Sequence, residues 1–264
     1  YQQAVDWIGD ALQPLGDAYV TALRQGALEE RWVDYAPTIG KQGGAASMLD
    51  LTPPFIYMSY DESLMSATTL AHELGHSMHS YLSKDQHPAV YNDFDLQSMA
   101  TAETASTFHQ AMLRDYLIKS KQDDRQLTLA VIDEAMFNFH SNIFRLLTLA
   151  RFEFTVFSRA ESGQSLTVND LNGIMGELFA EGYGETLTDD PTRTAIAWAQ
   201  FGHTYRPFYS FQYAVGQSTA EALATRVLSG VEGAATDYLA FLRAGSTRYP
   251  LDLFKLAGVD MTSP

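Results

Sequence analysis

A histidine-rich helix constrains this sequence more than any other feature. The stretch "TLAHELGHSMHS", which begins at Thr69, contains three of the seven histidines of the chain. Residues four apart lie one turn apart on the same face of an α-helix, so the imidazoles of His72 and His76 can share one metal ion. Glu73 lies beside this face, where it can act as a base on a water held by the metal. The spacing therefore predicts a metal-binding helix over residues 61–83, and Asp61 is its expected N-cap.

A catalytic zinc ion takes three protein ligands and leaves one position open, so a third donor is required. His79 lies on nearly the same face as His76, but one turn too far along the helix. A histidine six residues after His76 is another known solution, but that position is Leu82. Glu103 lies in a second predicted helix among small residues ("ATAETAS"), which would let the two helices approach closely. Because packing gives little reason for a lone carboxylate there, we favour Glu103 as the third ligand.

Simpler explanations account for the remaining candidates. Ser106, one turn from Glu103, could orient the ligand, and a packing role explains it equally well. Asp93 and Asp95 are alternative ligands, but their loop is typical of a solvated turn, as is the loop that contains His87. Four rings are expected in the core of the protein: His109, His140, Phe208 and Phe211.

Composition limits the ligands and the partners. The chain contains no cysteine, so a metal must be held by histidines or carboxylates, and the cytoplasm is the expected location. Its 32 acidic residues against 17 basic ones give a net charge of −15, which disfavours nucleic acid and anionic membranes. Charged residues interrupt the most apolar stretch, which begins at Ile143, before it reaches a membrane-spanning length. We therefore expect no nucleic acid and no membrane among the partners.

Helical periodicity dominates the chain, beginning with an amphipathic helix over residues 4–29. Residues 36–60 differ, because "PTIGKQGGAASM" and "PPFIYMSY" indicate two short extended segments around glycine and proline turns. We expect a mainly α fold with a small β element near residues 36–60, in one domain over residues 1–264. The other predicted helices cover residues 61–83, 96–120, 125–162, 167–182, 192–202, 208–229, 233–243 and 250–257.

Several segments, in order along the chain, resemble the oligoendopeptidase F and thimet oligopeptidase family of zinc metallopeptidases, and the oligoendopeptidase F branch more closely. They are "GKQGGAAS" with "PPFIYMSY", "TLAHELGHSMHS", "MATAETAST" and "HTYRPFYSFQYAVG". The resemblance implies a zincin-like helical metallopeptidase catalytic domain. It implies one zinc ion per chain, with His72, His76 and Glu103 as ligands and Glu73 as the general base. It also implies an endopeptidase whose substrates are short unstructured peptides.

The last of these segments is similar to the C-terminal tyrosine motif of the family, which implies that it holds the substrate and its oxyanion. Which tyrosine has which part stays open, because the spacing differs between branches of the family. Glycine-rich extended backbone near residue 43 could pair with the backbone of a bound peptide. The residues assigned are His203 and Tyr209 for catalysis, and Tyr205, Tyr213, Gly43 and Gly44 for substrate binding.

The chain departs from the family in its length. Members are usually about twice as long, with an N-terminal helical half that forms the other wall of a deep peptide channel. We expect that half to be absent, so the chain is either a catalytic-domain fragment or a short relative whose second wall comes from another copy, in a homodimer. Two alternatives to an active oligopeptidase stay open: a catalytically impaired peptide-binding relative, and a zinc hydrolase of another amide substrate.

Overall fold

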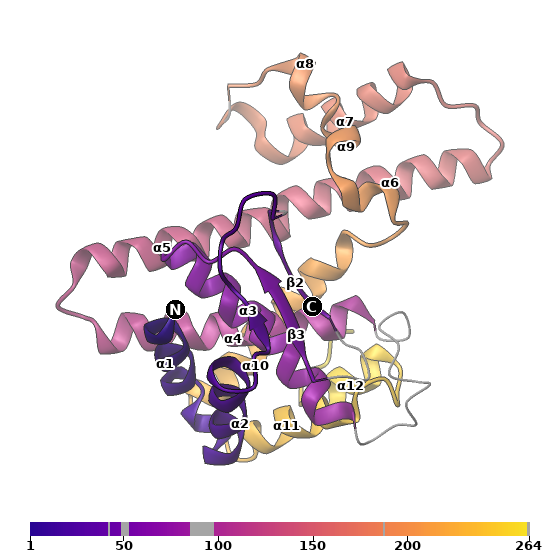
Figure 1. The fold of residues 1–264 in the computed structure, drawn as a ribbon. Coiled ribbons are helices and arrows are strands. Elements are labelled where there is room, and N and C mark those ends of the chain that lie inside the picture. Colours follow the sequence, from indigo (N-terminus) through magenta and orange to yellow (C-terminus); the bar gives the residue numbers. More distant parts are fainter. Residues whose placement is uncertain (42, 49–52, 85–97, 187, 263–264) are drawn as a thin grey trace. The chain divides into compact units, whose positions relative to one another are not determined.

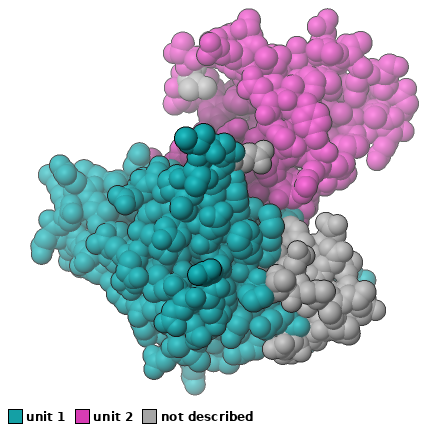
Figure 2. Space-filling model, viewed as in Figure 1, with its two compact units in different colours: residues 1–135, 216–264 teal, residues 136–215 magenta. Residues whose placement is uncertain are grey.

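The computed structural model describes residues 1–41, 43–48, 53–84, 98–186 and 188–262. These residues are mainly helical and include one three-stranded sheet, as the sequence predicts (Figure 1). The chain forms two compact units: unit 1 comprises residues 1–135 and 216–264, and unit 2 comprises residues 136–215 (Figure 2). The helices α5 (Arg125–Phe139) and α10 (Phe211–Leu228) contain the points at which the chain passes between units. The single catalytic domain over residues 1–264 stays a prediction.

Unit 1 begins with two helices where periodicity predicted one. Helix α1 (Gln2–Ala11) and helix α2 (Asp17–Leu28) are separated by the 3₁₀ turn η1 (Gln13–Leu15). Pro14 lacks the N–H that a continuous helix would need, and Gly16 has a φ of 96°, which glycine adopts without steric cost. The predicted opening helix is therefore broken at these two residues.

A small sheet confirms the β element predicted near residues 36–60. Its strands are β1 (Val33–Asp34), β2 (Ala45–Met48) and β3 (Phe55–Met58), in the order β1-β3-β2. The central strand β3 is parallel to β1 and antiparallel to β2, with Ala46 opposite Tyr57. Within the described chain, β2 is therefore an edge strand, with one side of its backbone free of sheet partners.

Helices α3 (Leu64–Ser83) and α4 (Met99–Ser120) pack against each other and form the centre of unit 1. The N-cap of α3 is Ser63, whose hydroxyl accepts the backbone N–H of Ser66 at 3.1 Å. The predicted cap, Asp61, instead accepts hydrogen bonds from the backbone of Ser63 and the hydroxyl of Ser66, and so braces the turn before the helix. The helix therefore begins later than predicted, because the serine hydroxyl takes the capping role.

Two C-terminal helices cover the central pair. Helix α11 (Ala234–Ala244) packs against α3, and helix α12 (Pro250–Leu256) packs against both α11 and α4. Phe108 of α4 stacks on Tyr238 of α11, with ring centroids 3.8 Å apart. The core of unit 1 is thus formed by helices from both ends of its sequence, with α3 and α4 in the middle.

Unit 2 contains two long helices and several short ones. Helices α6 (Leu146–Glu161) and α7 (Val168–Tyr183) supply its small core, which consists of Leu146, Leu149, Phe152, Ile174 and Met175. A π-helical turn, η5 (His140–Arg145), separates α5 from α6, where periodicity predicted one uninterrupted helix. The predicted helix over residues 192–202 is wrong, because short turns replace it. These short elements are α8 (Pro191–Thr194), α9 (Ala197–Gln200) and the start of η7 (Gly202–Tyr205), and a further 3₁₀ turn, η6 (Gly184–Thr186), follows α7.

Three of the four rings expected in the core are exposed. His140 lies at the surface, with its Nε2 2.8 Å from the hydroxyl of Tyr183. Phe208 and Phe211 are 44% and 42% exposed, because regular helix begins only at the second of them. His109 is buried as predicted.

Candidate metal centre

Two histidines of α3 and one glutamate of α4 converge inside unit 1. Candidate ligand atoms of His72, His76 and Glu103 lie within 4.8 Å of one another. Glu103 Oε2 is 3.2 Å from His72 Nε2 and 3.7 Å from His76 Nε2. The two imidazole rings have their centroids 4.9 Å apart, as expected for residues one helical turn apart. The structure thus brings together the three residues that the sequence singled out as ligands.

Two glycines allow the surrounding helices to approach closely at this point. A β-carbon on Gly75 of α3 would lie 2.6 Å from Ala105 O and Ser106 Cα of α4. A β-carbon on Gly216 of α10 would lie 2.6 Å from the Cβ of Glu103. A larger residue at either position would push α4 away from its neighbour. The small residues of α4 indicated a close approach, but sequence reasoning missed Gly216, whose only signal is a glycine inside a helical pattern.

Hydrogen bonds from α4 orient two of the three convergent side chains. Oε1 of Gln110 lies 3.1 Å from Nδ1 of His72. Because an amide oxygen can only accept, Nδ1 is the donor and Nε2 is left to face Glu103. Ser106 donates its hydroxyl to Glu103 Oε2 at 3.0 Å, so the orienting role considered for it agrees with its contact. Sequence reasoning missed Gln110, although it lies two turns after Glu103 on the same helix.

Burial and charge oppose each other among these groups. Burial acts to raise the pKa of Glu103, but His76, His72 and Ser106 outweigh it and lower that pKa to about 2. Burial lowers the pKa of His76 to about 4. Burial also acts to lower the pKa of His72, but the carboxylate of Glu103 raises it to about 9. The carboxylate of Glu103 therefore favours a positive charge beside it, which a proton on His72 supplies here. A metal cation bound by the three side chains would supply the same positive charge.

Glu73 lies beside the cluster and is not part of it. It is 5% exposed, and burial raises its pKa to about 7 against the opposing charge of His72. A hydrogen bond with the backbone of Ser47, in the edge strand β2, favours the ionised carboxylate. The hydroxyls of Ser47 and Ser77 also lie 3.0 Å apart, which joins β2 to α3. A carboxyl group with this pKa can gain and lose a proton near neutral pH.

Of the competing ligand candidates, the structure describes His79, which is not part of the cluster. His79 is buried and stacks on Phe241, with ring centroids 5.5 Å apart. Asp93, Asp95 and His87 lie outside the described residues. Among the residues that the structure describes, no second group of three histidine or carboxylate side chains converges in this way.

The two glycines predicted to bind substrate lie directly before the edge strand. Gly43 and Gly44 form a bend, and the φ of Gly44 is 95°. The expectation that their own backbone is extended is therefore wrong, because a positive φ turns the chain at this point. Extended backbone begins at Ala45, the first residue of β2. Their role in substrate binding stays a prediction.

The tyrosine segment, residues 203–215 of unit 2, brings three of its four predicted residues together. The ring centroid of His203 lies 4.6 Å from that of Tyr209 and 5.7 Å from that of Tyr213. Nε2 of His203 is 3.2 Å from the hydroxyl of Tyr213. Tyr205 is different, because it is 67% exposed and donates its hydroxyl to the carbonyl of Ala199 at 3.2 Å.

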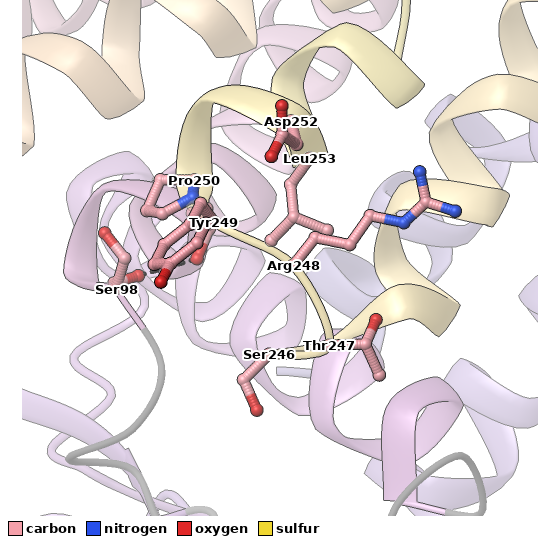
Figure 3. A pocket seen from close by; sticks show the side chains of 9 residues that line it. Ser98, Ser246, Thr247, Arg248, Tyr249, Pro250, Asp252 and Leu253 are labelled. Carbon is pink, nitrogen blue, oxygen red and sulfur yellow. Dashed lines mark hydrogen bonds between the residues drawn. The ribbon is translucent and has the colours of Figure 1, made fainter.

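A pocket of about 500 Å³ lies elsewhere in unit 1 (Figure 3). It is lined by the loop before α12, which includes Arg248 and Tyr249, and by Ser98 and Thr101 near the start of α4. In Figure 3 the guanidinium of Arg248 points away from Ser98. None of the predicted site residues lines this pocket, so the pocket is separate from the cluster of His72, His76 and Glu103.

Residues 10–264 match the sequence pattern of Peptidase family M3. The chain belongs to Peptidase family M3. It is 36% identical to oligopeptidase PepF of Bacillus subtilis, covering 100% of this chain and 39% of the relative. It is 34% identical to an oligoendopeptidase F homolog of Lactococcus lactis, covering 100% of this chain and 43% of the relative. A crystal structure of a candidate peptidase from Chlamydophila abortus is 33% identical, with a TM-score of 0.82 over 100% of this chain and 44% of the other.

Membership in family M3 confirms the predicted resemblance and the mainly helical fold class. The chain spans about two fifths of the length of the curated relatives it matches, so their activities belong to longer proteins. Among the described residues, no helix is both long enough and apolar enough to cross a bilayer.

Proposed function

We propose that this M3 chain contributes the catalytic centre of a zinc-dependent endopeptidase that hydrolyses short unstructured peptides. The observation that carries the proposal is the convergence of His72, His76 and Glu103 in a chain of this family. Two imidazole nitrogens and a carboxylate oxygen are donors that zinc accepts, and three protein ligands leave a fourth position open. We infer one zinc ion per chain. When bound, zinc lowers the pKa of a coordinated water and polarises a substrate carbonyl.

Glu73 acts as the general base of the proposed reaction. Its carboxylate takes a proton from the attacking water and later delivers that proton to the leaving amine. Burial raises the pKa of this carboxyl group, which favours the uptake of the proton from the water. The backbone of Ser47 fixes the carboxylate beside the zinc ligands, and Gln110 and Ser106 fix the ligands themselves.

The edge strand β2 and the tyrosine segment supply the proposed substrate contacts. A peptide in extended conformation can add to the free side of β2 by backbone hydrogen bonds, after the bend at Gly43 and Gly44. His203 and Tyr209 donate hydrogen bonds to the oxyanion as it forms, and Tyr213 orients His203 through its hydroxyl. We also assign Tyr205 to substrate binding. Backbone recognition of this kind gives affinity for many sequences and requires an unfolded substrate.

The rival functions make different demands on these residues. A peptide-binding relative without catalysis would have no need for Glu73, and the retention of a buried carboxyl group beside intact ligands favours the peptidase. A zinc hydrolase of another amide would not need the tyrosine segment. The cytoplasmic location, the exclusion of nucleic acid and of membranes as partners, and a homodimer that supplies a second wall stay predictions.

The proposal is tested by metal analysis together with cleavage of a mixed peptide library, with and without a chelator. We expect one zinc per chain and cleavage of short peptides that the chelator abolishes, whereas a well-folded protein stays intact. The Glu103→Ala variant should lose zinc affinity by more than about 100-fold, because even the groups behind metal ligands contribute 10- to 100-fold. Full zinc occupancy in that variant would show that the third ligand lies elsewhere, and hydrolysis of another amide but no peptide would favour the rival hydrolase.

A further inference from the structure

The backbone just before Tyr209 adopts an unusual conformation. Phe208 has a φ of 57°, in the left-handed region that residues with a β-carbon seldom occupy. In the described chain, Arg31 and Glu62 are the other non-glycine residues with a positive φ, and both belong to unit 1. Such a conformation costs free energy and persists only where neighbouring groups hold it. The groups that hold Phe208 therefore also fix the direction in which the chain continues into Tyr209.

Two side chains of α6 hold Phe208. Oε1 of Glu153 accepts a hydrogen bond from the backbone N–H of Phe208 at 3.1 Å. The ring of Phe157 packs against the ring of Phe208, with centroids 5.1 Å apart. Glu153 and Phe157 lie one turn apart on the same face of α6. One helix face thus fixes both the backbone and the side chain of Phe208.

Burial of the Glu153 carboxylate costs free energy unless neighbouring groups stabilise its negative charge. The residue is 3% exposed, and burial raises its pKa. The groups that act in the opposite direction are the N–H of Phe208 and the hydroxyl and backbone of Ser210. Within the described residues, neither Oε2 of Glu153 nor the hydroxyl of Ser210 has a hydrogen-bond partner, so the bond to the N–H of Phe208 is the contact that the geometry supports. The carboxylate therefore binds the backbone directly before Tyr209.

We propose that Glu153 is a positioning residue, which binds the backbone N–H of Phe208 directly before Tyr209 and thereby holds the ring of Tyr209 against His203. The two rings have centroids 4.6 Å apart and an interplanar angle of 46°. Without the carboxylate, Phe208 relaxes to a negative φ, and Tyr209 leaves His203. The catalytic consequence rests on the function proposed above for Tyr209, whereas the geometric consequence does not.

The test is a double-mutant cycle in the full chain. Glu153→Met keeps the volume of the side chain and removes the acceptor, and Phe208→Gly removes the steric cost of a positive φ. Glu153→Met should lower kcat about 10- to 100-fold, because a misplaced catalytic group costs that much, and leave KM, zinc content and helix content nearly unchanged. In the Phe208→Gly background the same substitution should lower kcat less than about threefold, because no strained conformation needs to be held.

Hydrogen exchange of the Phe208 amide supplies a readout that needs no activity. Exchange should accelerate at least about tenfold in Glu153→Met, because the amide loses its acceptor. Glu153→Gln keeps an acceptor oxygen and should retain both the protection and most of the turnover. The matched control is Glu161→Met, at the exposed end of the same helix, which should change neither quantity.

Several results would overturn the proposal. It is wrong if Glu153→Met costs the same turnover in both Phe208 backgrounds, or if the Phe208 amide keeps its protection in that variant. Should Glu153→Met fail to fold, the Gln variant decides the question, because loss of protection there contradicts the proposed acceptor. If the unaltered chain cleaves no peptide, the proposed function fails, while the exchange data still decide the role of Glu153.

Discussion

The helices that contain the candidate metal ligands and the tyrosine segment hold their proposed functional residues in opposite ways. In unit 1, Glu103 sits on a long helix that is buried over most of its length and contacts α3 and α10 where glycines allow close approach. In unit 2, Tyr209 lies on irregular backbone between the turn η7 and helix α10, and the nearby Phe208 and Phe211 are more than two fifths exposed. One region is fixed by packed helices, and the other by the contacts of one carboxylate and a few rings.

This difference fits the tasks proposed for the two regions. Metal ligands must keep one geometry within a few tenths of an ångström, which buried helices provide because their side chains have no room to move. Substrate contacts must admit a peptide and release products, and loops supported by a rigid helix suit that purpose. The comparison predicts that substitutions of the candidate metal ligands or of the glycines packed around them affect metal binding or stability, whereas those in the tyrosine segment change turnover alone.

The largest effect is expected for Glu73→Gln. The substitution keeps the size and the hydrogen-bonding reach of the side chain but removes the base, so turnover should fall about 10²- to 10⁴-fold. Zinc content should barely change, because Glu73 lies outside the convergent cluster. Zinc stoichiometry and peptide turnover are measured on the same purified sample. Near-normal turnover would contradict the mechanism, and loss of both metal and activity would identify Glu73 as a ligand or a structural residue.

A smaller effect is expected for Tyr209→Phe, and Tyr205→Phe is its matched control. Loss of one donor to the oxyanion typically lowers kcat about 10²- to 10³-fold, and we expect the lower end because His203 remains. Tyr205 stands apart from the aromatic group and is assigned to binding alone, so removal of its hydroxyl should act on KM and change kcat by less than about threefold. Steady-state kinetics and zinc analysis separate the two variants. The reverse order of effects would assign the oxyanion contact to Tyr205 and break the proposed division within the segment.

The smallest effect concerns stability and compares one glycine from each unit. Gly75→Ala should lower the free energy of unfolding by about 1–3 kcal/mol, because its β-carbon would overlap the backbone of α4. Gly173→Ala, inside α7 of unit 2, should raise it by about 0.5–1 kcal/mol, because open space surrounds that position and alanine favours the helix. Urea unfolding followed by circular dichroism measures both. Equal stabilisation by the two substitutions would show that α3 and α4 have room to separate.

Local periodicity accounts for what could be predicted about the metal centre. The spacing of His72 and His76 follows from the geometry of one helix, and it needs no knowledge of neighbouring elements. The small residues around Glu103 indicated the close approach of a second helix, which Gly75 and Gly216 then permit. The break at Pro14 and Gly16 was also readable in the sequence, and the predicted opening helix was wrong because periodicity was given more weight than these residues.

The sequence by itself determined which residues could hold a metal, the helical class of the fold and the family. Only the tertiary structure decided that Gln110 orients His72, that His140 lies at the surface, and that Phe208 has a left-handed backbone held by Glu153. The physical reason is the range of the interactions. Spacing along one helix is a local property, whereas a hydrogen bond between helices depends on packing that residues far apart in the chain create together.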